Sequence, residues 1–375
     1  HTGGTDMAAS SKVYFTDFRV RNDEDMLRKL KRLCKAAGME QIDFNDQFTA
    51  IKMHFGEPGN LAFLRPNYAR VLVDYVKQLG GRPFLTDANT LYTGLRRNAL
   101  DHLDSAYLNG FSPLTTGCHV LIADGLKGTD EVHVPVDGDY VRRAKIGRAV
   151  MDADIFISLT HFKGHEATGF GGTLKNIGMG CGSWAGKKEM HSSEKPAVDR
   201  ELCTGCETCL ANCAHDAVRI IEGHANIATD VCTGCGRCIS VCPTGAIRPM
   251  DDQALQILVC KIAEYTKAVV QDRPHFHVSL IMDVSPYCDC YAASDAPIVP
   301  DVGMLASFDP VALDQACADL VNRQPVMPNS MLGEAGTPMG DHFNHLHSGT
   351  DWAYGLQHAE IIGLGTRAYE LITLK

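Results

Sequence analysis

Eight cysteines between Cys203 and Cys242 are the residues of this sequence best suited to chemistry. They form two runs of the same spacing, Cys-x2-Cys-x2-Cys-x3-Cys, and Pro243 follows the second. This spacing lets three thiolates of one tight loop reach three irons of a 4Fe–4S cubane, while the fourth cysteine binds the other cluster. The predicted ligand sets are Cys203, Cys206, Cys209 and Cys242 for one cluster and Cys232, Cys235, Cys238 and Cys213 for the other.

Zinc is the alternative metal for these runs, because Cys-x2-Cys also suits a tetrahedral zinc site. A third cysteine at the same spacing, and a fourth just before a proline, favour clusters over zinc. The first run has Ala214 where the second has Pro243, a change that removes no ligand. The ligand residues are compatible both with redox-active clusters and with purely structural ones.

A glycine-rich stretch follows a predicted strand that ends at Thr160. Eight glycines lie between residues 164 and 186. Glycines let a backbone approach a ligand closely and point N–H groups at an anion. We therefore expect a ligand-binding loop, although its spacing matches neither the Walker motif nor a dinucleotide fingerprint. The alternative is a loop whose backbone conformation requires glycines but which binds no ligand. The candidate ligand-binding residues are His165, Gly171, Gly172, Lys175 and Asn176.

Polar residues also follow the neighbouring predicted strands. His54 follows one strand and Asp87 another, as His161 and Lys163 follow the strand before the glycines. The carboxyl ends of parallel strands meet at one edge of a sheet. We expect these four candidate catalytic residues to converge on one cleft, where they could do acid–base work or hold a metal. Lys163 or Lys175 would favour an anionic ligand. Each residue alone could equally be a cap or a surface group.

A Cys-x-Cys pair, Cys288 and Cys290, follows a Ser-Pro-Tyr sequence. Both cysteines of such a pair point the same way in an extended segment, which suits a shared metal better than a disulfide. Cys181 could supply a third ligand, so the sequence suggests a third metal site. Two ordinary thiols in a turn are the alternative.

Strand-like and helix-like patterns alternate outside the cysteine runs. Such alternation predicts an α/β fold with a mainly parallel sheet and helices on both faces. The expected strands are 12–18, 47–55, 83–89, 118–123, 154–160 and 277–284. The expected helices are 22–38, 65–80, 94–109, 140–152, 310–322 and a final stretch at 352–374.

The alternation stops near Pro196 and resumes near Leu255. We therefore expect one α/β domain made of residues 7–196 and 250–375, interrupted by a small inserted α+β ferredoxin-like module at 197–249. Residues 1–6 precede Met7 and are interpreted as an expression scar, with Met7 as the native start.

Charge and composition exclude some functions. The net charge of −10 argues against a nucleic-acid binder and against docking on an anionic membrane. No apolar run approaches the length of a membrane span, and no signal segment opens the chain. Fifteen cysteines without a secretory signal indicate reduced thiols and metal ligands, so we expect a cytoplasmic protein.

Several of these motifs together resemble a known family. They include KMHFGE at 52–57, LTDANTLYTG at 85–94, HFKGHEATGFGGTLKNIGMG at 161–180 and DVSPYCDC at 283–290. IVPDVGMLASFDPVALDQA at 298–316 and GLG at 363–365 extend the match over the chain from Met7 onward. The chain resembles domain-of-unknown-function family 362, in its branch of uncharacterised Fe–S centre proteins. The resemblance implies an α/β domain with an inserted bacterial-type two-cluster ferredoxin unit, and it implies no particular reaction.

The motifs favour an iron–sulfur oxidoreductase with two 4Fe–4S clusters. The clusters would relay electrons to or from an anionic small molecule at the sheet edge. The expected partners are a redox partner protein or this small-molecule substrate. An additional metal or organic cofactor is compatible with the sequence. One alternative is a non-enzymatic electron-transfer or cofactor-maturation protein. The other is a non-redox enzyme with structural clusters.

Overall fold

The computed structural model describes residues 10–21, 24–193, 195–250, 253–336 and 340–375. The expected scar at 1–6 and the expected start at Met7 lie outside the described residues.

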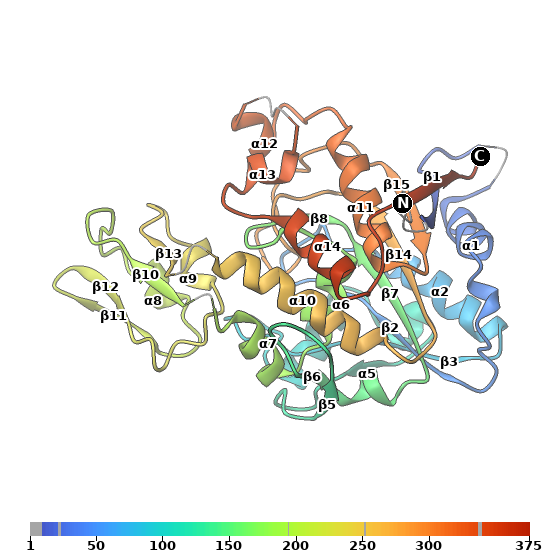
Figure 1. Ribbon diagram of the computed structural model, residues 1–375, viewed down its shortest axis with the longest axis horizontal. Coiled ribbons are helices and arrows are strands. Elements are labelled where there is room, and N and C mark those ends of the chain that lie inside the picture. The colour runs from blue at the N-terminus through green and yellow to red at the C-terminus, as the bar shows by residue number, and fades with distance from the viewer. Residues whose placement is uncertain (1–9, 22–23, 194, 251–252, 337–339) are drawn as a thin grey trace, which may run out of the picture.

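An eight-stranded sheet forms the centre of the larger part of the molecule (Figure 1), in the order β16-β1-β15-β14-β7-β2-β3-β4. All neighbouring strands are parallel except at β15, which runs against both β14 and β1. The predicted mainly parallel sheet is therefore confirmed. The strands are β1 (Ser11–Asp17), β2 (Phe48–Lys52), β3 (Arg82–Asp87), β4 (Val120–Ile122), β7 (Ile155–His161), β14 (His275–Ile281), β15 (Gly303–Ser307) and β16 (Tyr369–Thr373).

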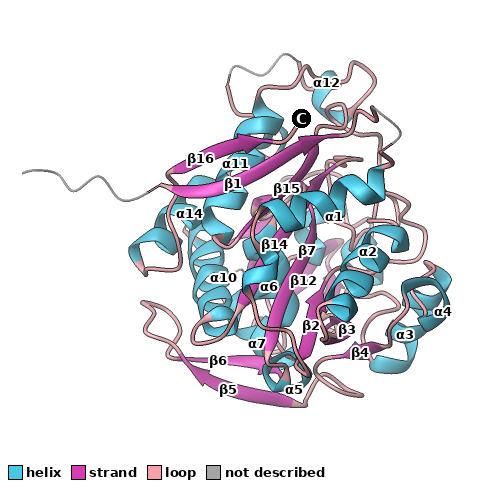
Figure 2. Cartoon of the chain, turned by 90° about the vertical axis from the view of Figure 1, so that its right-hand side faces the viewer, coloured by secondary structure: helices cyan, strands magenta, loops and turns pink. Residues whose placement is uncertain are grey.

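Helices cover both faces of this sheet (Figure 2). On one face lie α1 (Met26–Ala36) and α2 (Pro66–Gln78), and on the other α6 (Thr173–Cys181), α10 (Ala254–Val270), α11 (Pro310–Asn322) and α14 (Trp352–Ile361). Strand β7 is buried throughout and supplies both cores, because successive side chains of a strand point to opposite faces. Phe156 packs in one hydrophobic cluster, while Ile155 and Ile157 pack in the other.

Local sequence signals set the ends of these helices. Helix α11 begins at Pro310, and the Asp309 carboxylate accepts hydrogen bonds from Val311 N and Ala312 N at 2.8 and 3.0 Å. Helix α2 also begins with a proline and is followed by Gly80, whose φ of 87° suits a glycine after a helix.

Two predicted helices are wrong in part. Residues 140–152 contain β6 (Arg143–Gly147), which pairs with β5 (Glu131–Pro135), and only then the short α5 (Arg148–Asp152). Ala144 and Ile146 are buried while Lys145 between them is more exposed, which is the period of a strand. The stretch 352–374 is helical only to Ile361 and then forms β16 beside β1.

The segment from Pro196 to Pro249, here named the cysteine segment, adds no described strand to the large sheet. Its own β10 (Pro196–Val198) pairs with β13 (Ile247–Pro249), which brings its two ends together. Between them lie α8 (Thr208–Ala211), β11 (Val218–Ile221), β12 (His224–Ile227) and α9 (Arg237–Ser240). A separate cluster of buried side chains stabilises the segment, which lies at the left of Figure 1.

The remaining elements connect these layers. They are η1 (Met39–Gln41), α3 (Ala99–Leu108), α4 (Pro113–Thr116), β8 (Lys163–His165), β9 (Gly169–Gly171), α7 (Trp184–His191), α12 (Met331–Glu334) and α13 (His342–Leu346). Within the described ranges, no helix combines the length and the apolar character needed to cross a membrane.

Candidate functional site

A cavity of about 820 Å³ lies where β2 and β3 end, between the α/β part and the cysteine segment. Its walls come from the strand ends, the glycine-rich stretch, α6, α7, α10 and two loops of the cysteine segment. This volume lies in the range of small-molecule sites. Of the four predicted catalytic residues, the structure brings His54, Asp87 and Lys163 to this cavity.

Asp87, the last residue of β3, is buried and surrounded by basic side chains. Its carboxylate lies 2.9 Å from Lys52 Nζ, 3.4 Å from Arg96 Nη1 and 3.7 Å from His102 Nε2. Burial favours the protonated acid, but Lys52 and His102 outweigh it and hold the pKa of Asp87 well below its usual range. Asp87 is therefore a permanent anion that positions Lys52 and Arg96, rather than an acid–base catalyst.

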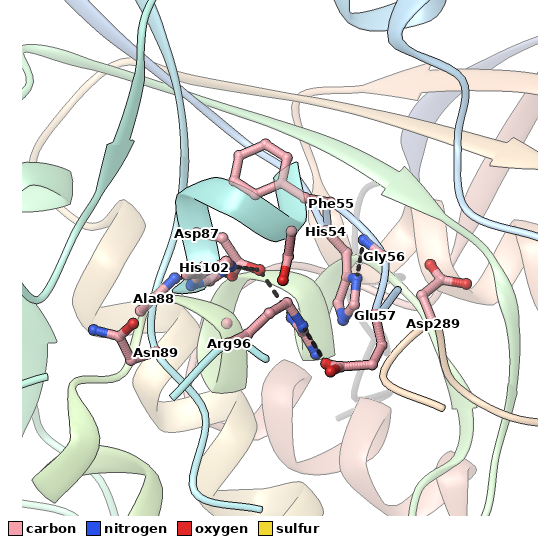
Figure 3. Close-up of polar contacts among 12 residues, drawn as sticks. His54, Phe55, Gly56, Glu57, Asp87, Ala88, Asn89, Arg96, His102 and Asp289 are labelled. Carbon is pink, nitrogen blue, oxygen red and sulfur yellow. Dashed lines mark hydrogen bonds and ion pairs between the residues drawn. The ribbon is translucent and has the colours of Figure 1, made fainter. Parts of the chain in front are cut away.

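Arg96 joins the two strand ends (Figure 3). Its guanidinium Nε lies 2.9 Å from the Glu57 carboxylate, and it also contacts Asp87 and the Tyr92 hydroxyl. The side chain is 1% exposed. A buried guanidinium shared by two carboxylates fixes the loop after β2 against the loop after β3.

His54 presents a neutral ring to the cavity. Its Nδ1 accepts a hydrogen bond from Gly56 N at 2.9 Å, which leaves the proton on Nε2. Burial, together with the charge of Arg96, holds the pKa of His54 well below its usual value. His54 can therefore donate a hydrogen bond from Nε2 to an oxygen of a ligand.

His161 does not line the cavity, so its predicted place in the cleft is wrong. Both of its ring nitrogens are used, Nδ1 at 2.8 Å from the Asp289 carboxylate and Nε2 at 2.8 Å from Met282 O. Lys163 Nζ lies 3.3 Å from the same carboxylate. Burial opposes ionisation of Asp289, but His161 and Lys163 hold its pKa well below the usual range. His161 thus positions the loop that carries Asp289.

The glycine-rich stretch contributes side chains to the cavity rather than free backbone N–H groups. At the start of α6, Thr173 N and Leu174 N donate to the Asp314 carboxylate at 2.6 and 2.9 Å. This carboxylate occupies the helix N-terminus where an anion was expected, and a Cβ at Gly172 would collide with it at 2.4 Å. Gly171 and Gly172 are not among the lining residues, which corrects their prediction as an anion loop.

His165, Lys175 and Asn176 do line the cavity. Asn176 Oδ1 accepts from Lys52 Nζ at 2.9 Å, and its Nδ2 donates to Thr160 Oγ1 at 2.9 Å. Asn176 therefore holds the Lys52 ammonium beside Asp87. Lys175 Nζ lies 3.0 Å from the sulfur of Cys288.

The cavity lining is cationic although the protein is acidic. Its described residues include only two carboxylates, Asp87 and Glu166. The seven cationic side chains of the lining are Lys52, Arg96, Lys163, Lys175, Lys187, Arg237 and Arg248. Lys52, Arg96 and Lys163 are paired with buried carboxylates, so the positive charge that favours an anionic ligand comes from the other lining cations.

The predicted third metal site is not assembled. Cys181 ends α6 inside the hydrophobic core, where burial raises its pKa to about 11, and it does not join Cys288 and Cys290. Over the described ranges, no group of three or more His, Cys, Asp or Glu side chains is arranged to hold a single metal ion. A cubane places a different requirement on its ligands, because each thiolate binds its own iron.

The eight cysteines of the cysteine segment separate into two groups of four. One small cavity is lined by Cys213, Cys232, Cys235 and Cys238, and another by Cys203, Cys206, Cys209 and Cys242. In each group three cysteines come from one run and the fourth from the other run. The loop residues Cys235, Gly236 and Arg237 line both the first of these and the large cavity.

A family model described as domain of unknown function (DUF362) matches residues 49–319, which is most of the chain. The chain belongs to the DUF362 family. A thylakoid-associated protein of Synechocystis sp. is 26% identical over 124 residues, which are 33% of this chain and 35% of the relative. The chain thus matches only about a third of that curated relative's length.

Two solved structures are distantly similar to this DUF362 chain. A protein from Thermotoga maritima has a TM-score of 0.40 at 14% identity, covering 80% of this chain and 60% of the other. A lactate racemase apoprotein from Thermoanaerobacterium thermosaccharolyticum has a TM-score of 0.34 at 11% identity, covering 73% and 51%. Neither score is high enough to transfer a site.

The DUF362 cavity contains residues that the sequence did not reveal. Arg96 falls within the expected helix 94–109, but α3 begins only at Ala99, so Arg96 lies in the loop before it, and no local signal marks it as a site residue. Lys187 follows the glycine-rich stretch on α7, and burial lowers its pKa to about 8. Burial also raises the pKa of Asp124, which interacts with Lys187, to about 6. Lys187 can therefore exchange a proton near neutral pH.

Proposed function

We propose that this protein is an iron–sulfur oxidoreductase that acts on an anionic small molecule bound in the large cavity. The observation that carries the proposal is the position of Cys235, a predicted cluster ligand that also lines the large cavity. Electron transfer requires a redox centre close to the substrate, and the loop Cys235–Arg237 is the wall that the two cavities share.

The cysteine loops fit a cubane in their backbone as well as in their side chains. The first loop has positive φ at Gly205 and Glu207, and the second at the equivalent Gly234 and Gly236. A Cβ at Gly205 would lie 2.2 Å from Gly223 O, so the turn requires glycine there. Gly234 N donates to the Cys232 sulfur at 3.4 Å, as N–H groups do in cluster loops.

When bound, each 4Fe–4S cluster would store and pass one electron at a time. The cationic side chains of the lining bind and orient the anion, and the neutral His54 ring donates a hydrogen bond to one of its oxygens. Lys187 lines the cavity with its Nζ donating to Gly182 O, and burial lowers its pKa to about 8, so it is the candidate donor of the proton that accompanies electron transfer.

A redox partner protein would exchange electrons at the opposite end of the cysteine segment. Cys206, in the other group of four cysteines, is exposed, whereas Cys235 is half-buried against the cavity. An exposed cluster at Cys206 would also serve a non-enzymatic electron carrier. The large cationic cavity beside the group that contains Cys235 favours an enzyme. A non-redox enzyme with structural clusters would not need this shared wall.

The proposal predicts both metal content and anion binding. Protein purified anaerobically should contain about eight iron and about eight sulfide per chain and give an EPR signal after reduction with dithionite. Inorganic phosphate and citrate, as two anionic probes, should bind by calorimetry. Lys187→Met should weaken their binding by roughly 10-fold or more, the loss of one charge-assisted contact.

Lys188→Met is the matched control for this substitution, since Lys188 is the next residue along α7 and is exposed. Its effect on anion binding should be small. Zinc in place of iron, or equal effects of the two lysine substitutions, would argue against the proposed function.

A further inference from the structure

The pair Cys288 and Cys290 lies in a β-turn at the wall of the large cavity. Tyr291 N donates to Cys288 O at 3.0 Å, which closes the turn. Cys288 is 1% exposed, and Cys290 lines the cavity in front of it. The two cysteines are only two residues apart in this turn, and each thiol shifts the pKa of the other, which is lowered for Cys288 and raised for Cys290.

The sulfur of Cys288 is surrounded by donors. Lys175 Nζ lies 3.0 Å away, and His165 and Cys290 both act to lower the pKa of the Cys288 thiol. A lysine ammonium at hydrogen-bond distance from a buried sulfur suits a thiolate. The hydrogen bond from Cys290 and the charge of Lys175 hold the pKa of Cys288 well below its usual value, although burial opposes them.

The backbone of this turn is held rigidly from behind. The Asp289 side chain points away from the cavity to His161 and Lys163, and Asp289 O accepts from Glu57 N at 2.9 Å. Asn60 Nδ2 donates to Tyr291 O at 2.8 Å. These bonds fix the backbone of the turn that carries the two cysteines.

We propose that Cys288 and Cys290 are a redox-active dithiol that closes to a disulfide in the cavity wall. In the opening direction, the disulfide takes up two electrons and one proton, the S–S bond breaks, and the products are the Cys288 thiolate and the Cys290 thiol. The electrons come from reduced iron–sulfur centres, one electron from each of two clusters, and the proton comes from solvent in the cavity.

This inference rests on the proposed function and deepens it, because a two-electron store beside the ligand matches two one-electron donors. Lys175 would stabilise the thiolate product, and Cys290 would be the sulfur nearer to the ligand. A strained ring between residues two apart is expected to be readily reduced, as labile rather than structural disulfides are.

The test counts electrons in the full-length protein. Anaerobic protein is oxidised with diamide, desalted and titrated with dithionite while cluster absorbance is followed. The wild type should take up about four electrons per chain, and Cys288→Ser and Cys290→Ser about two each. Cys118→Ser, which removes a buried thiol elsewhere, should behave as the wild type.

A measurement on the unsubstituted chain keeps the test independent of how the variants fold. After diamide, iodoacetamide should label neither Cys288 nor Cys290, and after dithionite it should label both, as read at each position of the tryptic peptide that contains them together with Cys317. Labelling of both before reduction would overturn the dithiol.

The remaining outcomes separate this inference from the proposed function. Uptake of about two electrons by the wild type and both variants, with bleaching of the clusters, overturns the dithiol alone. Uptake of about two electrons by the wild type without bleaching, and none by the variants, supports the dithiol and overturns the cluster function. Loss of a bound metal in Cys288→Ser would instead identify a metal site and overturn the dithiol.

Discussion

Asp87 shows how a single buried carboxylate can organise a site without taking part in proton transfer. Three cationic or ionisable side chains, Lys52, Arg96 and His102, converge on it from β2, the loop after β3, and α3. Each is held in place partly by this charge. The cationic lining of the cavity is therefore built on a buried anion, and removing one partner leaves another charge unpaired.

Arg96→Met tests this dependence at the level of one residue. It would leave the buried carboxylates of Asp87 and Glu57 without their shared guanidinium, which should cost about 3–5 kcal/mol of stability. Arg142→Met, at an exposed arginine, should change stability by no more than about 0.5 kcal/mol. Urea unfolding followed by circular dichroism measures both, and equal midpoints for the two variants would contradict the buried network.

His54 gives a prediction about pH. Its pKa in the folded protein lies well below its usual value, so the unfolded chain binds a proton that the folded chain excludes. The effect of His54 on the free energy of unfolding is therefore absent above about pH 6.5, and the protein becomes less stable as the pH drops below that value. At pH 5.5 the wild type should have lost up to about 1.4 kcal/mol relative to His54→Gln.

This difference is measured as unfolding free energies of the two proteins between pH 7.5 and 5.5. His119→Gln, at an exposed histidine, measures the effect of the substitution itself. A constant difference between the wild type and His54→Gln over this range would show that His54 titrates normally.

At the scale of elements, the sequence predicts what local patterns encode. Periodicity, proline and capping residues predict strand β2, which ends two residues before His54, strands β3 and β7, which end at Asp87 and His161, and the helix from Pro310. Partners distant in sequence decide the rest. Strand β16 is defined by pairing with β1 at the other end of the chain.

In the candidate site too, local patterns predict some features and contacts between residues distant in sequence decide the others. Convergence of His54 and Asp87 is predictable, because parallel strands end at one edge. His161 turns away because Asp289, 128 residues later, binds its ring. The start of α6 is occupied by Asp314, which lies 141 residues after Thr173. No local pattern could reveal either contact.

The cysteine segment provides the test at this scale. Val198 and Ile247 are paired neighbours, so Asp199–Ala246 can be replaced by Asn-Gly to form a two-residue hairpin. We expect the α/β part to stay folded, so the shortened protein should keep the far-UV circular dichroism of an α/β protein. It should contain no iron and should bind phosphate more weakly than the wild type.

The full-length double variant Cys235→Ser, Cys238→Ser is the control for this replacement. It retains the wall of the cavity while removing two predicted ligands, so it separates loss of iron from loss of the wall. If the shortened chain is insoluble, the segment is integral to the core and the inserted-module interpretation is wrong.

At the scale of the whole molecule, the cysteine segment is docked by specific contacts rather than tethered loosely. The Arg237 guanidinium lies 4.3 Å from the centre of the Tyr291 ring, directly after the Cys-x-Cys pair. His215 packs at 5.9 Å against Trp184 of α7. These contacts hold one group of four cysteines against the cavity and leave Cys206, in the other group, at the surface.

The most direct test of the account is the position of iron in crystals of anaerobically purified protein. Anomalous diffraction at the iron edge should give two centres, one among Cys203, Cys206, Cys209 and Cys242 and one among Cys213, Cys232, Cys235 and Cys238. The second centre should lie in the wall of the large cavity beside Arg237. A signal at the zinc edge instead of the iron edge, or iron with a different set of cysteines away from the cavity, would contradict the account.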